Sequence, residues 1–306
     1  MAGDPDAWLS HHIFENRASL VWVSDVDDTL VDTKAMHSKA AEAMAPALNS
    51  TLGVSKTQHV LHCFRATFDA LLDAHQESHD SEDATDYTAL EERVEDCQIS
   101  IRRRWGATKR FSREVLIWIA GQDCGLALTA DQVGSATDAY WAEMTARPQV
   151  FADAPELFTL VRENSGLWPL LMTSSDARFH LGLDGQFEYD VARSLAFKEA
   201  RIAKLNDFGI SHGGLFVGDP VDKPDPEYFA RLFTHVDSLQ RPKSKRLTVF
   251  LGDSYRSDIE VPLSLNTQAV GVLVDRGTLK PRVVDDRLIV VNTLSHLSDA
   301  LKGGRR

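Results

Sequence analysis

Short apolar runs alternate with helix-like patterns over most of this chain. The apolar runs predict six buried strands, Leu20–Ser24, Leu167–Met172, Leu215–Val217, Leu247–Leu251, Ala269–Val274 and Leu288–Val291. Apolar residues spaced as on one helix face predict helices at Pro155–Asn164, Glu199–Asp207, Pro226–Val236 and Asp258–Leu265. Strands that alternate with helices predict an α/β fold, with a Rossmann-like parallel sheet and helices on both of its faces.

The stretch between the first two predicted strands has a different pattern. Residues 34–149 are rich in Ala, Glu, Asp, Arg and Gln and poor in strand-like runs. Val60, Phe64 and Phe68 have the spacing of one helix face, whereas the acidic Glu77–Asp86 predicts an exposed loop or helix end. We therefore expect an α/β core formed by residues 1–33 and 150–306, with an inserted all-helical domain at 34–149.

Composition narrows the class of protein. Of the 306 residues, 43% are hydrophobic and 25% are charged, which is ordinary for a globular protein. No run approaches the roughly 18 consecutive apolar residues of a membrane helix, and Met1–Ser10 lacks an apolar signal segment. The net charge of -12 argues against nucleic acid as a partner, and Arg102–Arg104 is typical of a solvated helix face. We expect neither nucleic acid nor a membrane as a partner.

Cysteine usage indicates a reducing compartment. Cys63, Cys97 and Cys124 are an odd number of cysteines at wide spacings. They suit reduced thiols better than a disulfide framework or a zinc site. We therefore expect a cytoplasmic protein.

Three carboxylates crowd the point where the first predicted strand ends. Asp25, Asp27 and Asp28 directly follow Leu20–Ser24. Mutual repulsion makes such crowding costly unless a cation or a reacting group uses it. Ligands of open α/β sheets bind outside the carboxyl ends of strands, which is where these residues are expected. An acidic surface turn is the alternative that this motif alone leaves open.

Three further polar motifs follow later predicted strands. The hydroxyl residues Thr173–Ser175 follow one strand, Lys223 lies after the next, and Asp253 and Asp258 follow Gly252. Each motif alone fits an ordinary feature: a polar turn, a surface lysine, or loop carboxylates with a helix cap. Their occurrence together, in order and each at a strand end, favours one composite site.

These residue types suit phosphoryl transfer. A carboxylate can act as a nucleophile through an aspartyl-phosphate, and a second acid can protonate the leaving oxygen and later activate water. Hydroxyl, lysine and backbone N–H groups can hold the oxygens of the phosphoryl group. Mg²⁺ prefers oxygen ligands and would offset the repulsion among the carboxylates. Hydrolysis of a phosphate monoester needs up to ~10²¹-fold acceleration, which demands a site of several parts.

With these four motifs, the chain resembles the haloacid dehalogenase (HAD) superfamily. The helical insertion is similar to the cap that the family places after its first motif, and Arg276-Gly277 also resembles these enzymes. The resemblance covers about Leu20 to Thr278. The matching motif residues are Asp25, Asp27, Thr29, Thr173, Lys223, Gly252, Asp253 and Asp258.

The resemblance implies roles for the acidic residues. Asp25 would be the nucleophile and a metal ligand, and Asp27 would be the general acid/base with its backbone carbonyl on Mg²⁺. Asp253 would bind Mg²⁺ directly. Asp28 stands where many members have glycine, so the resemblance gives it no catalytic role.

The resemblance also implies how the substrate is held. Thr173, Ser174 and Lys223 would bind its phosphoryl group. Asp258 would orient a metal-bound water or Lys223, as residues behind a metal site commonly do. Substrate choice would fall to the helical insertion, where His37 is the first candidate, although such a residue is more often structural.

Asp27 discriminates among the activities of the family. Dehalogenase members lack an aspartate at this position, because a halide leaving group needs no proton. We therefore expect a Mg²⁺-dependent phosphatase that hydrolyses a small phosphorylated metabolite, such as a sugar phosphate or a nucleotide monophosphate. A phosphomutase resembling β-phosphoglucomutase and a non-catalytic HAD-fold regulatory module remain open as alternatives.

Overall fold

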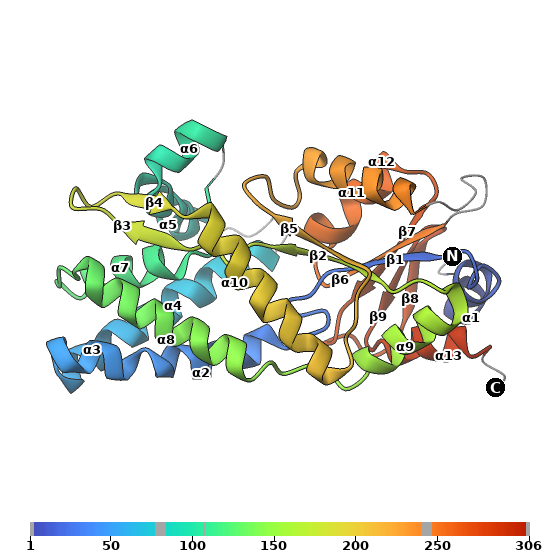
Figure 1. Cartoon of the computed structure of the whole chain (residues 1–306), viewed down its shortest axis with the longest axis horizontal. Helices are drawn as coiled ribbons and strands as arrows, with labels where there is room; N and C mark the ends of the chain where they lie inside the picture. Colours follow the sequence, from blue (N-terminus) through green and yellow to red (C-terminus); the bar gives the residue numbers. More distant parts are fainter. Residues whose placement is uncertain (1–2, 77–83, 107, 240–246, 304–306) are drawn as a thin grey trace. The chain divides into compact units, whose positions relative to one another are not determined.

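The computed structural model describes residues 3–76, 84–106, 108–239 and 247–303 of the chain. The chain divides into two compact units (Figure 1). We call Met1–Thr33, Gln149–Ser174 and Ile202–Arg306 the sheet unit, and Lys34–Pro148 with Ser175–Arg201 the helical unit.

The sheet unit contains a seven-stranded sheet in the order β5-β2-β1-β6-β7-β9-β8. All neighbouring strands are parallel except β8 and β9, which confirms the predicted parallel α/β fold. The strands are β1 (Val21–Ser24), β2 (Leu170–Ser174), β5 (Gly214–Gly218), β6 (Thr248–Gly252), β7 (Ala269–Val274), β8 (Arg282–Asp285) and β9 (Leu288–Val291).

Helices cover both faces of this sheet. Figure 1 shows α11 (Pro226–Ser238) and α12 (Val261–Leu265) on one face, and α9 (Ala154–Ser165) and α13 (Ser295–Leu301) on the other. Phe229 and Leu232 of α11 pack in one apolar cluster with Val23 and Met172 of the central strands. Burial of this cluster is the main favourable term that holds α11 on the sheet.

The start of α11 follows from the sequence around it. Asp225 caps the helix by accepting a hydrogen bond from the backbone N–H of Glu227, and Pro226 occupies the first turn. Proline is favoured there because the first N–H groups of a helix have no partner within it. The shorter α1 (Pro5–Leu9) begins in the same way after Asp4.

The observed elements differ from the predicted ones at several ends. β2 begins at Leu170 rather than Leu167, because Pro169 has no N–H to contribute to a ladder. β8 was not predicted, since its alternation of exposed and half-buried residues is that of an edge strand. The predicted helix at Asp258–Leu265 begins earlier, as a π-helical turn over Tyr255–Glu260 that leads into α12.

The helical unit contains most of the predicted insertion. Its helices include α3 (Ala45–Leu52), α4 (Val54–Gln76), α5 (Ala84–Asp96), α6 (Ile99–Trp105), α7 (Arg113–Asp123) and α8 (Ala130–Ala146), and α2 (Thr33–Ala43) leads into it. Val60, Phe64 and Phe68 lie on the buried face of α4, as predicted. Of the predicted polar segment Glu77–Asp86, residues 77–83 lie outside the described residues, and Ala84 begins α5.

Ser175–Arg201 packs in the helical unit, whereas the sequence placed all of 150–306 in the α/β core. This segment forms the hairpin of β3 (Phe179–Leu181) and β4 (Phe187–Tyr189), and most of α10 (Val191–Ala203). The Phe187 ring lies edge-on to Trp118 of α7, with ring centroids 5.8 Å apart. Arg178 pairs with Glu114 of α7 at 2.7 Å, and both side chains are buried. An α/β pattern read along the sequence does not reveal such long-range contacts.

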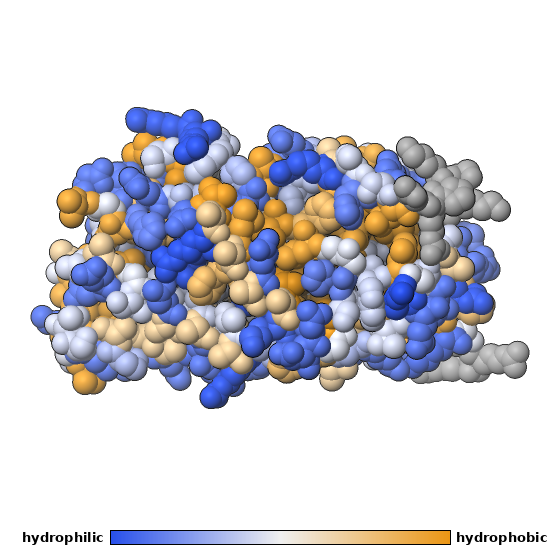
Figure 2. Space-filling model, viewed as in Figure 1, coloured by the Kyte–Doolittle hydropathy of each residue, from blue (hydrophilic) through white to orange (hydrophobic). Residues whose placement is uncertain are grey.

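The surface mixes polar and apolar residues. Figure 2 shows hydrophilic and hydrophobic side chains interspersed over the visible face. Among the described residues, no helix combines the length and the apolar character that crossing a membrane requires.

The ion pair of Arg276 with Asp153 links four segments of the sheet unit. Arg276, after β7, contacts both carboxylate oxygens of Asp153 at 3.1 and 3.2 Å and donates to the backbone carbonyl of Thr29. Asp153 also accepts hydrogen bonds from the hydroxyl of Thr293 and the backbone N–H of Leu294. Burial would raise the pKa of Asp153, but its bonds to Arg276, Thr293 and Leu294 outweigh burial and lower it.

We expect Asp153→Asn to reduce the free energy of unfolding at pH 7 by about 1.5–3 kcal/mol, the usual worth of a hydrogen bond to a charged group. Because the folded-state pKa of Asp153 is lowered, its contribution is present above the unfolded pKa and is lost as the pH falls through the folded pKa. The difference between wild type and variant in urea denaturation should therefore shrink below about pH 4. Asp207→Asn, at an exposed aspartate, is the control. A difference that stays constant with pH would contradict the ionic role of Asp153.

Candidate active site

The predicted site residues lie at one edge of the sheet. Strands β5, β2, β1 and β6 are parallel neighbours, so their carboxyl ends point the same way. Asp25 follows β1, Thr173 and Ser174 end β2, Lys223 follows β5, and Asp253 follows β6. All of them belong to the sheet unit. This edge is where open α/β sheets bind their ligands.

Lys223 lies between two carboxylates. Its Nζ atom is 2.6 Å from Oδ1 of Asp25 and 2.6 Å from Oδ1 of Asp258. The side chains of all three are at least 94% buried. Burial would lower the pKa of Lys223, but the Asp25 and Asp258 carboxylates outweigh burial and raise it well above its ordinary value. Lys223 therefore carries its charge throughout the neutral pH range.

Asp25 is held at both ends. Its backbone N–H donates to the carbonyl of Leu251, which fixes it against β6, and its Oδ2 accepts a hydrogen bond of 3.1 Å from the Thr29 hydroxyl. Burial raises the pKa of Asp25 to about 7, with further increases from Asp258 and Asp27 and an opposing effect of Lys223. A second cation, in addition to Lys223, would therefore favour the ionised form of Asp25 at neutral pH.

Asp253 completes a group of three carboxylates. One oxygen each from Asp25, Asp253 and Asp258 lies within 4.8 Å of the others. Burial raises the pKa of Asp253 well above its ordinary value, and the charges of Asp25, Asp258 and Asp28 raise it further. One lysine does not balance three carboxylates. Buried oxygen donors with unbalanced negative charge are the donor set that Mg²⁺ prefers, so these residues fit this ion.

Asp258 is held by hydrogen bonds to Lys223 and to the backbone of Ser254. Its Oδ1 accepts from Lys223, and its Oδ2 accepts from the backbone N–H of Ser254 at 3.1 Å. Both oxygens therefore have protein partners. Asp258 approaches the end of β6 so closely that a Cβ atom at Gly252 would overlap its carboxylate. Gly252 is thus required for packing at this point, which the sequence showed only as a glycine before two acids.

The other two acids of the first motif differ from Asp25. Asp27 is half-buried and accepts a hydrogen bond of 2.8 Å from the Thr33 hydroxyl. Asp28 has a φ of 60°, in the left-handed region, where glycine is free of strain and aspartate is among the better-tolerated alternatives. This backbone conformation favours glycine, and aspartate is one of the few other residues that tolerate it.

Thr173 and Ser174 lie at the same edge but are less tightly bound to the group. Thr173 is fully buried, and its hydroxyl donates to the carbonyl of Ser174 at 3.3 Å. Ser174 is half-buried. In the part of the chain that the structure describes, no hydrogen bond joins either hydroxyl to Asp25 or Lys223. Their link to the carboxylates is the pairing of β2 with β1.

Sequence reasoning did not anticipate three contacts of the first loop. These are the bond of Thr29 to Asp25, the bond of Thr33 to Asp27, and the bond of Arg276 to the Thr29 carbonyl. The two threonines lie four and six residues after their partners. Such short spacings in a tight loop were the available signal.

In the helical unit, His37 is part of an aromatic core. Its ring stacks on Phe68 with centroids 3.7 Å apart, and Nδ1 hydrogen-bonds the Tyr140 hydroxyl at 2.8 Å. Burial lowers the pKa of His37 to about 3, with smaller contributions from Arg113 and Arg65. These contacts give His37 the structural role that the sequence analysis held to be the commoner one.

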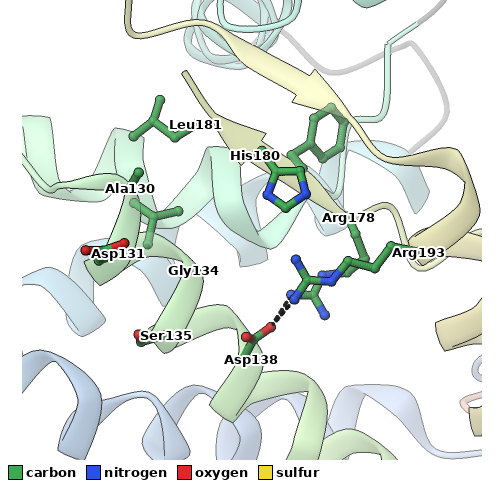
Figure 3. Close-up of a pocket in the computed structure, with 11 residues that line it drawn as sticks. Ala130, Asp131, Gly134, Ser135, Asp138, Arg178, His180, Leu181 and Arg193 are labelled. Carbon is green, nitrogen blue, oxygen red and sulfur yellow. Dashed lines mark hydrogen bonds and ion pairs between the residues drawn. The ribbon is translucent and has the colours of Figure 1, made fainter. Parts of the chain in front are cut away.

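The same unit contains a pocket of about 300 Å³ beside α8 and β3. Figure 3 shows Arg178 and Arg193 pointing toward Asp138, which accepts hydrogen bonds of 2.5 and 2.7 Å from them. Arg178 also pairs with Glu114. Both arginines thus have carboxylate partners, so the pocket has no excess of positive charge to attract a phosphorylated ligand.

Comparison with known proteins bears on the fold. No family model matches the chain, and no curated protein matches it significantly. Solved structures do match. One is YfnB of Bacillus subtilis, assigned as a HAD hydrolase and bound to magnesium, with 17% identity over 93% of this chain and 99% of that chain, and a TM-score of 0.53.

A second is a haloacid dehalogenase-like family hydrolase from Xanthomonas campestris, with 19% identity over 94% of this chain and 96% of that chain, and a TM-score of 0.50. At such identities, structural similarity establishes the fold. The chain therefore has the fold of the HAD hydrolases.

Proposed function

We propose that this protein is a Mg²⁺-dependent phosphatase that hydrolyses a small phosphorylated metabolite through an aspartyl-phosphate. The observation that carries the proposal is the buried Lys223 between Asp25 and Asp258, with Asp253 beside them. A fixed positive charge next to a carboxylate nucleophile suits a phosphoryl group, whose oxygens need donors while its phosphorus is attacked.

In the first step, an oxygen of Asp25 attacks the phosphorus, and the bond to the leaving alcohol breaks. Thr29 and Lys223 orient the Asp25 carboxylate through their hydrogen bonds. Asp27 donates the proton that the leaving oxygen takes up, and Thr33 holds Asp27 for this transfer. In the second step, Asp27 removes a proton from water, which attacks the phosphorus and releases Asp25.

The phosphoryl oxygens are bound by donors at the same edge. Lys223 supplies a permanent charge, which Asp258 keeps in place. Thr173 and Ser174 end the neighbouring strand and contribute hydroxyl groups. Asp25 and Asp253, with the backbone carbonyl of Asp27, would hold Mg²⁺. The ion would neutralise the carboxylates and reduce their repulsion toward an anionic substrate.

We expect Asp25→Asn to abolish phosphate release from an aryl phosphate in the presence of Mg²⁺. The loss should exceed about 10³-fold, since removal of a catalytic nucleophile can cost about 10⁶-fold. Asp28→Asn is the matched control, because it makes the same acid-to-amide change in the same loop and asparagine also tolerates a positive φ. Full activity of Asp25→Asn would refute the proposal. Conversion of a sugar phosphate to an isomer without phosphate release would favour a phosphomutase.

We expect Asp27→Asn to separate the two chemical steps. An aryl leaving group needs little protonation, so about one equivalent of phenol should be released per chain in a burst. Phosphate release should then be slowed by about 10²–10⁴-fold, because the attacking water lacks its base. Rapid-quench measurement of phenol and phosphate checks this outcome. Steady turnover at the wild-type rate would exclude Asp27 as the general acid/base.

We expect Mg²⁺ to raise the melting temperature more at pH 8 than at pH 5. The pKa of Asp25 is raised to about 7 and that of Asp253 well above its ordinary value. Without the ion, the two carboxyl groups contribute most to the free energy of unfolding below their unfolded-state pKa, near about 4. That contribution is lost as the pH rises through their folded-state pKa values, because the carboxyl groups then ionise in the folded protein. Mg²⁺ binds the ionised forms and restores about 2.7 kcal/mol at 100 times its Kd.

Asp253→Asn removes a proposed ligand and serves as the comparison for this measurement. The Mg²⁺-dependent shift should disappear in this variant and remain in Asp28→Asn. Shifts of equal size at both pH values in wild type would contradict the link between carboxylate ionisation and ion binding.

A further inference from the structure

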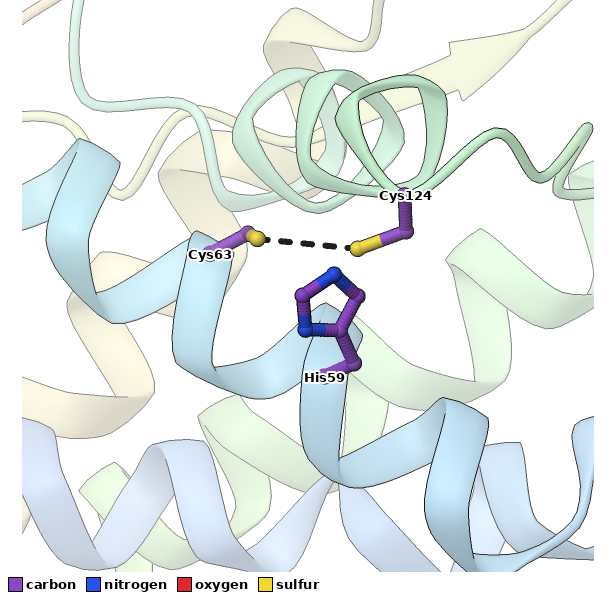
Figure 4. A group of neighbouring side chains, drawn as sticks. All are labelled: His59, Cys63 and Cys124. Carbon is purple, nitrogen blue, oxygen red and sulfur yellow. Dashed lines mark hydrogen bonds between the residues drawn. The ribbon is translucent and has the colours of Figure 1, made fainter.

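His59, Cys63 and Cys124 form a second cluster of potential metal ligands, within the helical unit. His59 and Cys63 are four residues apart on α4 and therefore project from the same side of that helix. Cys124 is the C-terminal cap of α7. The two sulfur atoms are 3.5 Å apart, and one imidazole nitrogen lies within 4.8 Å of both. Figure 4 shows the imidazole ring turned toward the two sulfurs.

The sulfur separation suits a shared metal ion better than a disulfide. Zinc–sulfur bonds are about 2.3 Å long, so two thiolates on one tetrahedral ion lie about 3.8 Å apart. The observed distance is 3.5 Å, so only small adjustments are needed. A disulfide bond of about 2.05 Å would require the sulfurs to approach by about 1.5 Å, a larger adjustment than a shared ion needs.

The surroundings favour a cation and allow it to enter. α7 spans 11 residues, and the carbonyls at its C-terminal end carry partial negative charge toward Cys124. The adjacent Asp123 is ion-paired with Arg93 at 2.7 Å, so the carboxylate of Asp123 attracts a cation at the cluster less strongly. His59 is exposed and both cysteines are half-buried, which leaves the cluster within reach of solvent.

We propose that His59, Cys63 and Cys124 bind one borderline-soft divalent cation of the Zn²⁺ class. Binding displaces one proton from each thiol, and the two thiolates and the neutral imidazole become ligands. Three protein ligands leave a fourth tetrahedral position open to solvent, so the bound ion is exchangeable. The ion joins the first half of α4 to the end of α7 and thereby stabilises the helical unit. This site is independent of the carboxylate group after β1 and of the proposed phosphatase activity.

The test is titration of the reduced, full-length protein with Co²⁺, in the presence of saturating Mg²⁺. Co²⁺ bound by thiolates gives sulfur-to-metal charge-transfer absorption in the near ultraviolet, which carboxylate ligands do not give. We expect these bands to saturate at one equivalent per chain and to disappear when Zn²⁺ is added. Zn²⁺ should also raise the melting temperature.

Matched variants locate the ligands. Cys63→Ser, Cys124→Ser and His59→Ala should each weaken Co²⁺ affinity by about 100-fold or more, because loss of even a residue behind the ligands typically costs 10–100-fold. Cys97→Ala and His62→Ala alter a thiol and an imidazole outside the cluster and should leave the affinity unchanged. Circular dichroism establishes that each variant is folded.

Two results would overturn the proposal. One is the absence of thiolate bands in the folded, reduced wild type, including the case in which mild oxidation yields a Cys63–Cys124 disulfide. The other is persistence of the bands in the Cys63→Ser/Cys124→Ser double variant.

Discussion

The other acidic groups at the sheet edge depend on the salt bridges of Lys223 with Asp25 and Asp258. Buried charges are costly unless they are paired, and the pairing here is incomplete, because Asp253 adds a third carboxylate to one ammonium group. Removing Lys223 alone would leave the carboxylates facing one another with no protein cation between them. Burial raises the pKa values of Asp25 and Asp253, and the neighbouring carboxylates raise them further. A further cation beside these carboxylates would offset the negative charge that Lys223 leaves unbalanced.

The fold provides the rigidity that such an arrangement needs. Four parallel strands place their ends at one edge, so residues far apart in sequence meet without long loops. Gly252 allows Asp258 to approach the end of β6, and Asp28 in the first loop has a positive φ of 60°. Arg276 joins that loop to Asp153 and, through it, to the chain after β9.

Much of the sheet unit could be predicted from the sequence, because short runs of neighbouring residues determine its strands. The runs Ala269–Val274 and Leu288–Val291 are strands at the predicted boundaries, and the residues chosen for the site lie at strand ends along one edge. The helical unit was less predictable. Ser175–Arg201 joins it through contacts such as that of Arg178 with Glu114, 64 residues apart, which no local pattern encodes. Cys63 and Cys124 are 61 residues apart in the sequence, and only the fold brings their sulfur atoms to 3.5 Å from each other.

The two candidate cation sites differ in the chemistry of their donor atoms, so they favour different ions. Asp25 and Asp253 offer hard carboxylate oxygens, which suit Mg²⁺. Cys63, Cys124 and His59 offer soft sulfur and imidazole nitrogen, for which Mg²⁺ has little affinity and zinc-class ions have much. Zinc-class ions also bind carboxylates, but they bind thiolate and imidazole more tightly. The thiol cluster would therefore be occupied first when such an ion is scarce. An ion held there would leave the carboxylates to Mg²⁺, and both units could then carry the cation that their own side chains select.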